Sequence, residues 1–210
     1  NVLVRVDDDE SNESLFTVTL AGITVFTLST DNGPTSIALS PDDETALVTF
    51  EGSDSVTTFF AQELMQGSVV SQQGLSVATT LSEALYSADG SKVFLLHFGT
   101  PESAGHSVVV LDTEDDYAVE KTINVGNRPT RMTLNSNGTQ LFVTNFQDGS
   151  VSVIDVGSLE VTSTFRVKTG PDGIALSNDD SKCYVCNFFA DTVSVINPDT
   201  TLTLGTIEFF

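Results

Sequence analysis

The chain has 210 residues, with 29 acidic side chains against 8 basic ones and a formal net charge of −21. Such an acidic surface repels the phosphates of nucleic acids and of anionic lipid headgroups, so we expect no nucleic-acid partner and no polybasic docking on a membrane. The sequence has no run of 18 apolar residues, so we also expect no membrane insertion. Hydrophobic residues make up 40% of the chain, which favours a folded core over disorder. The chain starts at Asn1, so we expect either that a leader was removed or that the sequence is a piece of a longer protein.

The first thirty residues contain three short apolar segments, at residues 1–6, 14–20 and 23–30. Their length and their content of β-branched and aromatic residues predict three β-strands. We interpret them as the second, third and fourth strands of a repeating unit whose first strand is missing.

From Pro34 onward the chain repeats itself. Similar segments begin at Pro34, Leu81, Pro129 and Pro171, and their tight turns lie 47, 48 and 42 residues apart, at Asp42-Asp43, Asp89-Gly90, Asn137-Gly138 and Asp179-Asp180. A period of about 40–50 residues is that of a four-stranded propeller blade. Each unit reads as a strand A, an Asx or Gly turn, a strand B, an acidic loop, a strand C and a Thr-rich strand D.

Two segments carry a recognisable motif. LFVTN at Leu141 is followed by SVSVID, and CYVCN at Cys183 by TVSVIN, with VGNRP and GPDGIALS as flanks. These residues resemble the YVTN-repeat, surface-layer-like β-propellers. The resemblance weakens toward the N-terminus, where Phe50 and His97 replace the motif Asn. It implies a propeller scaffold, an extracytoplasmic location and a binding or structural role. We expect the motif Asn, Asn145 and Asn187, to bond loop backbone at the end of strand B.

We therefore predict an all-β fold: a β-propeller of five blades of about four antiparallel strands, with an incomplete first blade and 19 strands in total. The predicted single domain spans residues 1–210, with blades at 1–31, 32–78, 79–126, 127–168 and 169–210. Three alternatives for the missing strand stay open. The ring closes with a three-stranded blade, a neighbouring subunit covers the edge, or the chain is a fragment of a longer propeller. The only helical turn expected is at residues 62–65.

No catalytic set is recognisable in the sequence, and we expect no enzyme and no cofactor-binding motif. His97 and His106 flank an insertion, and with Glu102 and Asp112 nearby they form a candidate transition-metal set. The competing interpretation is a pair of solvent-exposed loop histidines, so the metal-binding residues remain unknown.

Three further features of the sequence concern calcium binding, disulfide formation and glycosylation. Calcium at an acidic turn is one hypothesis, and solvated loop acids are the alternative; the clusters lie at residues 7–10, 42–44, 114–116 and 179–180. Cys183 and Cys186 lie three apart in a predicted strand, so they point to opposite faces and cannot form a disulfide. Asn12 and Asn137 begin glycosylation sequons.

Paired phenylalanines occur at residues 59–60, 188–189 and 209–210. Core packing is the default for such pairs, but Phe188-Phe189 in a loop and Phe209-Phe210 at the end are candidates for a subunit contact.

The function expected from these features is a non-enzymatic extracellular or cell-surface scaffold, surface-layer-like or filament-forming. Self-assembly or another surface protein would supply its partner. One alternative is a propeller enzyme or redox accessory, lactonase-like or dehydrogenase-subunit-like, with a metal or cofactor in the central channel. Another is a ligand-binding module of a larger surface protein.

Overall fold

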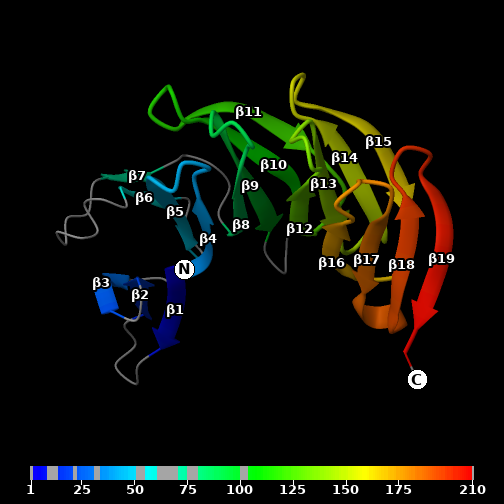
Figure 1. The fold of residues 1–210 in the computed structure, drawn as a ribbon, viewed down its shortest axis with the longest axis horizontal. Coiled ribbons are helices and arrows are strands. Elements are labelled where there is room, and N and C mark those ends of the chain that lie inside the picture. Colours follow the sequence, from blue (N-terminus) through cyan, green and yellow to red (C-terminus); the bar gives the residue numbers. More distant parts are fainter. Residues whose placement is uncertain are drawn as a thin grey trace.

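The computed structural model describes residues 2–8, 14–20, 23–30, 34–50, 55–60, 71–74, 80–99 and 104–209. Five antiparallel sheets follow one another along the chain (Figure 1). The first sheet contains β1 (Val2–Asp8), β2 (Ser14–Leu20) and β3 (Ile23–Thr30). The second contains β4 (Pro34–Leu39), β5 (Thr45–Phe50), β6 (Ser55–Phe60) and β7 (Ser71–Gly74). The third contains β8 (Leu81–Tyr86), β9 (Lys92–Gly99), β10 (Ala104–Asp112) and β11 (Ala118–Asn124).

The last two sheets have the same organisation. The fourth contains β12 (Pro129–Leu134), β13 (Gln140–Asn145), β14 (Ser150–Asp155) and β15 (Glu160–Arg166). The fifth contains β16 (Pro171–Leu176), β17 (Cys183–Asn187), β18 (Thr192–Asn197) and β19 (Leu202–Glu208), with a short 3₁₀ helix η1 (Phe188–Ala190) between β17 and β18. In every sheet the strands pair in sequence order. The predicted all-β, propeller-like architecture of five blades with an incomplete first blade is confirmed, and the described residues form 19 strands.

The blades follow an arc in which the first strand of each four-stranded blade is innermost. β4 contacts β8, β8 contacts β12, and β12 contacts β16. Closure of the ring through the three-stranded first blade is not observed: the arc is open in Figure 1, and no substantial contact joins β16–β19 to β1–β3 in the described part. The helical turn expected at residues 62–65 lies outside the described residues. η1 was not predicted.

The turns between strands A and B are built alike in four blades. Asp43, Gly90, Gly138 and Asp180 adopt positive φ values of 59°, 77°, 71° and 55° at the turns that the sequence predicts. In the last turn the Ser177 hydroxyl donates to Asp179 Oδ1 (2.6 Å), which also accepts from the backbone and hydroxyl of Ser181. These bonds lower the pKa of Asp179 to about 2. The acids in these turns therefore hold backbone in place as well as facing solvent.

Apolar packing between blades forms the core. Leu141, Val143 and Ile154 of the fourth blade pack against Phe94, Leu96 and Val110 of the third, and all are fully buried. The opposite face of the fourth blade packs Phe142, Val151 and Val153 against Cys183, Val185 and Ile196 of the fifth. Residues that alternate along a strand thus serve two different neighbours, which explains why strands B and C are apolar on both faces.

The motif asparagine joins the end of strand B to the loop that precedes its own blade. Asn145 is fully buried; its Oδ1 accepts from Gly126 N (3.0 Å), while its Nδ2 donates to the hydroxyls of Ser150 and Ser152. The structural role predicted for this residue is confirmed. A Cβ on Gly126 would lie 2.6 Å from Asn145 Cγ, so only glycine permits this approach.

The fifth blade shows what happens without that glycine. Lys168 stands three residues before Pro171, as Gly126 stands three before Pro129. Asn187 Nδ2 still donates to Ser194 Oγ (2.9 Å), but Asn187 Oδ1 is buried with no partner in the described part of the chain. The fifth blade therefore lacks the bond that Gly126 N donates to Asn145 in the fourth.

We predict that Gly126→Ala lowers the free energy of unfolding by about 1–3 kcal/mol, because the Asn145 oxygen loses its donor while it stays buried. Denaturant titration measures the change. Gly157→Ala is the control, since only Asp155 Oδ1 approaches that position, at 3.5 Å. Equal losses in the two variants would contradict the account.

A second prediction concerns acid stability. Because the pKa of Asp179 is held below its ordinary 3.8, its bonds stabilise the fold above that value and are lost as the pH falls toward about 2. The fourth blade has an asparagine, Asn137, at the position of Asp179. Asp179→Asn should therefore reduce the loss of stability between pH 4 and pH 2. Asp179→Ala should lower the melting temperature at pH 7. Thermal melts across this range test both, and an Asn variant as acid-sensitive as the parent would contradict them.

Candidate functional site

Aromatic side chains gather where strand B passes into strand C. Phe98, Phe146 and Phe188 each follow the motif position, which is His97, Asn145 or Asn187. The rings of Phe146 and Phe189 meet edge to face with centroids 5.3 Å apart, and Phe188 meets Phe189 at the same distance. Phe188 and Phe189 remain 66% and 67% exposed. We call Phe146, Phe188 and Phe189 the aromatic rim.

Local backbone explains why the aromatic rim forms. Gly170, with φ +70°, lies so close to Phe189 that an added Cβ would be 2.8 Å from its ring. Phe188 N donates to Gly170 O (2.7 Å), which ties η1 to the loop before β16. A glycine and a backbone bond thus hold two large apolar side chains at the surface.

Charged side chains lie at the same end of the blades. The Arg128 guanidinium lies 4.7 Å from the centroid of the Phe98 ring, a cation–π contact. Asp148 accepts from the backbone N (2.8 Å) and side-chain Nδ2 (3.0 Å) of Asn127. The surface around the aromatic rim therefore offers apolar area bordered by oriented charges, as protein-binding surfaces do.

The innermost strands present a second set of polar groups. Ser36 Oγ accepts from Ala84 N (3.1 Å), and one repeat later Glu83 Oε2 accepts from Met132 N (2.8 Å). Each bond joins a strand A to the strand A of the next blade. Thr35 and Thr130 add parallel links, donating to Leu81 O and Pro171 O. The sequence analysis missed Glu83. It is the third residue of its strand A, the position that Ser36 and Arg131 hold in the neighbouring units.

Glu83 carries a perturbed carboxyl group. Burial raises its pKa to about 7, against the opposing effects of the Met132 N–H and the Arg131 charge, while Asp172 raises it further. Arg131 occupies the next equivalent position and donates to Thr130 O (2.9 Å). Glu83, Arg131 and Asp172 thus lie on successive inner strands, and the charges of Arg131 and Asp172 both act on the pKa of Glu83.

The predicted metal set is not assembled. His97 Nδ1 lies 3.3 Å from Ser107 Oγ, and burial together with the charge of His106 lowers the pKa of His97. His106 is exposed, whereas Asp112 lies at the far end of β10, paired with Lys92. A nine-residue strand separates the two ends, so including Asp112 was wrong. Glu102 lies outside the described residues.

Within the described ranges, no three His, Cys, Asp or Glu side chains are grouped as a metal site. The acidic clusters at residues 42–44, 114–116 and 179–180 are turns, Asp7 and Asp8 lie in β1, and residues 9 and 10 lie outside the description. Calcium binding stays a hypothesis.

The two cysteines lie on opposite faces of β17, as predicted. Cys183 is buried, Cys186 is exposed and both are free thiols. Burial raises the pKa of Cys183 to about 12, so its thiol is unreactive while folded. Of the phenylalanine pairs, Phe188-Phe189 and Phe209 are exposed, the side chains of Phe59-Phe60 are outside the described set, and Phe210 is not described.

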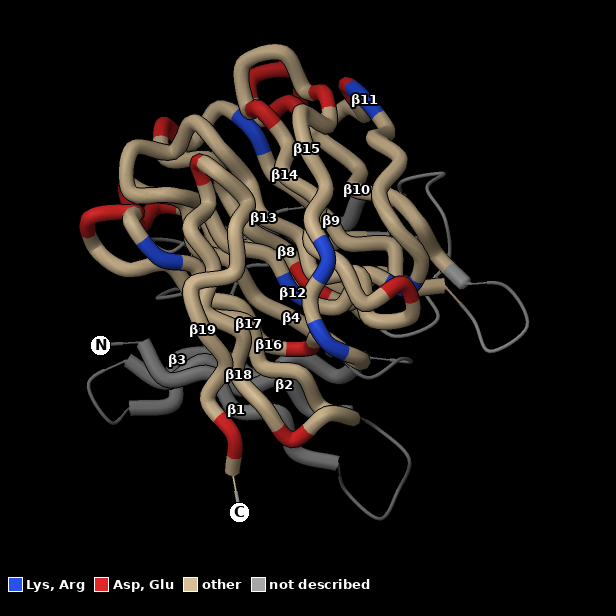
Figure 2. Tube along the Cα trace, turned by 90° about the vertical axis from the view of Figure 1, so that its right-hand side faces the viewer, with Lys and Arg blue, Asp and Glu red and all other residues tan. Residues whose placement is uncertain are grey.

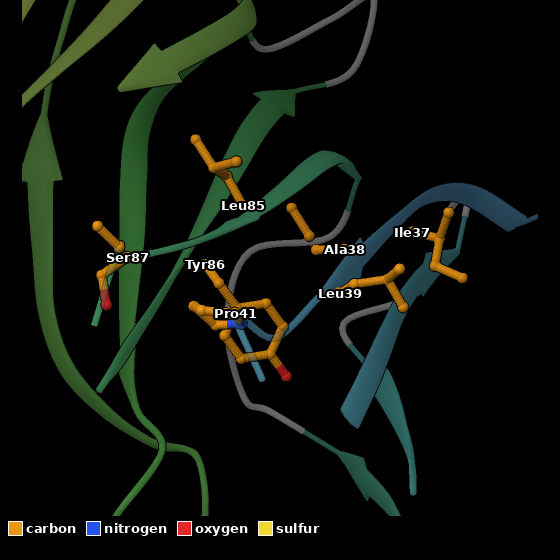
Figure 3. Close-up of a pocket in the computed structure, with 9 residues that line it drawn as sticks. Ile37, Ala38, Leu39, Pro41, Leu85, Tyr86 and Ser87 are labelled. Carbon is orange, nitrogen blue, oxygen red and sulfur yellow. The ribbon is translucent and has the colours of Figure 1, made fainter. Parts of the chain in front are cut away.

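An apolar groove of about 600 Å³ lies between β4 and β8 (Figure 3). Its walls are Ile37, Ala38, Leu39, Pro41, Ala84, Leu85, Tyr86, Ser87 and Ala88. The polar groups there are already engaged: the Tyr86 hydroxyl bonds that of Tyr117 (3.1 Å), and Ser87 Oγ donates to Asp89. The groove therefore offers shape and apolar contact, without a charged group among its lining residues.

No family model matches the chain, and no curated protein matches its sequence. Many solved structures do match its fold. One is Kuenenia stuttgartiensis hydrazine synthase, with a TM-score of 0.73 and 21% sequence identity over 86% of this chain. This likeness shows the shared fold alone. The chain spans about half the length of that protein chain, since 50% of it is covered. Among the described residues, no helix is long and apolar enough to cross a membrane.

We predict that Glu83→Gln removes a pH-dependent loss of stability. A raised folded pKa means that the folded state binds the proton more tightly, so Glu83 destabilises the fold increasingly as the pH rises from 4.5 to about 7. Gln keeps the acceptor for Met132 N. The free energy of unfolding of the variant should exceed that of the parent by about 3 kcal/mol at pH 8, and the two should agree near pH 4.

Denaturant titrations at several pH values measure this difference. Glu114→Gln, at an exposed turn, is the control. A constant difference between Glu83→Gln and the parent from pH 4 to pH 8 would contradict the assignment.

Proposed function

We propose that this protein is a non-enzymatic extracellular scaffold that binds a partner protein through the aromatic rim. The observation that carries the proposal is the exposure of Phe188 and Phe189, at 66% and 67%, on a conformation held by Gly170 and Phe146. Large apolar side chains held at a surface are characteristic of interaction sites. The partner is a surface protein or a second copy of the chain.

The charge distribution supports a scaffold at a cell surface. In Figure 2 the acidic residues of the described part lie mainly in the connections at strand ends, while the strands are mostly uncharged. Acids spread over both ends of the blades give solubility rather than one anionic binding patch. The motif segments at Leu141 and Cys183, which resemble YVTN repeats, point to the same surface-layer-like class.

The test is retention of the purified chain on cell envelopes of its source. Phe188→Ser combined with Phe189→Ser should reduce retention at least tenfold. Leu202→Ser combined with Leu204→Ser, which removes two comparably exposed apolar side chains from β19, should leave it unchanged. Equal retention of the parent and the phenylalanine variant would overturn the proposal.

One observation favours a second candidate, an enzyme or redox accessory acting in the central channel. Glu83 combines a pKa of about 7 with a position on an inner strand next to Arg131 and Asp172, and perturbed carboxyls cluster at catalytic sites. Elemental analysis and an absorption spectrum of protein isolated from its source decide between the two. A stoichiometric metal or chromophore would favour the enzyme.

A further inference from the structure

The outer face of the fifth blade corresponds in register to the face of the fourth blade that packs against the fifth. Tyr184 pairs with Val195, and Cys186 with Val193, in the same register in which Phe142 pairs with Val153 and Thr144 with Val151 one blade earlier. Ile207 likewise corresponds to Phe165. We call the residues Ala175, Tyr184, Cys186, Val193, Val195 and Ile207 the terminal face.

The two corresponding faces differ in burial. In the fourth blade, Phe142, Thr144, Val151, Val153 and Phe165 are at most 5% exposed, because the fifth blade covers them. On the terminal face, Cys186 is exposed and Ile207 is 47% exposed. A groove of about 470 Å³ opens over it, lined by Gly173, Cys186, Val193 and Phe209 among others. The terminal face thus continues, position by position, an interface already formed three times in the arc.

The first blade does not cover this face. The arc is open in Figure 1, and no substantial contact joins the fifth blade to β1–β3 in the described part.

We propose that the terminal face is covered by a further four-stranded sheet of the same repeat, in the same protein but outside residues 1–210. Its strands B and C would carry small aliphatic residues at the positions of Cys183, Val185 and Ile196, the set that covers the fourth blade. The length of the matched hydrazine synthase chain, of which this chain covers 50%, is compatible with such an addition. The groove over the terminal face also includes Phe188 of the aromatic rim, so a covering sheet would contact this residue as well.

Cys186 provides the test. Its thiol is exposed in the 210-residue chain, whereas Cys183 is buried and unreactive, so maleimide labels one site. In protein isolated from its source, labelling of Cys186 should be at least tenfold slower than in the 210-residue chain, and peptide sequencing should find additional repeats in the same polypeptide. Labelling after denaturation is the control for thiol integrity.

Every other outcome overturns the proposal. Equal labelling rates mean that nothing covers the face. Protection that disappears on dilution means a second copy. Protection already present in the 210-residue chain means that part of this chain covers the face. A source polypeptide that contains no repeats beyond these 210 residues also refutes it, while leaving the aromatic-rim function untouched.

Discussion

Packing of each sheet between two neighbours is the constraint on which the rest of this molecule depends. Strands B and C carry aliphatic side chains on both faces, so a single blade would expose as much apolar surface as it hides. Leu141 and Val143 face one neighbour while Phe142 faces the other, and all three are buried only because a sheet lies on each side. The arc, the innermost position of strand A and the exposed terminal face all follow from this arrangement.

Hydrogen bonds between inner strands orient each blade relative to the next. Thr35, Thr130, Ser36 and Glu83 each join the inner strand of one blade to that of the next. Where the sequence departs from the pattern, a buried polar group loses its partner. In the second and fourth blades, the hydroxyls of Thr35 and Thr130 bond those of Thr49 and Thr144. In the third blade, Leu96 takes the place of that second threonine, and Ser82 Oγ has no partner in the described part.

Most of the architecture was predictable because it is local. An Asx or Gly turn, a period near 45 residues and apolar runs predict hairpins that follow one another in sequence order, and the strands of the described residues pair in that order. Contacts between repeats were harder to predict from the sequence. The partner of Glu83 is Met132, 49 residues away, and neither segment alone contains a pattern that predicts this bond. Asp112 was misplaced for the opposite reason: it is near His106 in sequence, yet an extended strand carries it to the other end of the blade.

Amide hydrogen exchange measures the central constraint most directly. If a blade is stable because sheets cover both its faces, amides of β13 and β14 should exchange only through global unfolding, and their protection should report the full free energy of unfolding. Amides of β17 and β18, covered on one face by the fourth blade, should open at distinctly lower free energy in the 210-residue chain. Equal protection of these two strand pairs would contradict the account, because it would mean that a blade needs no second neighbour.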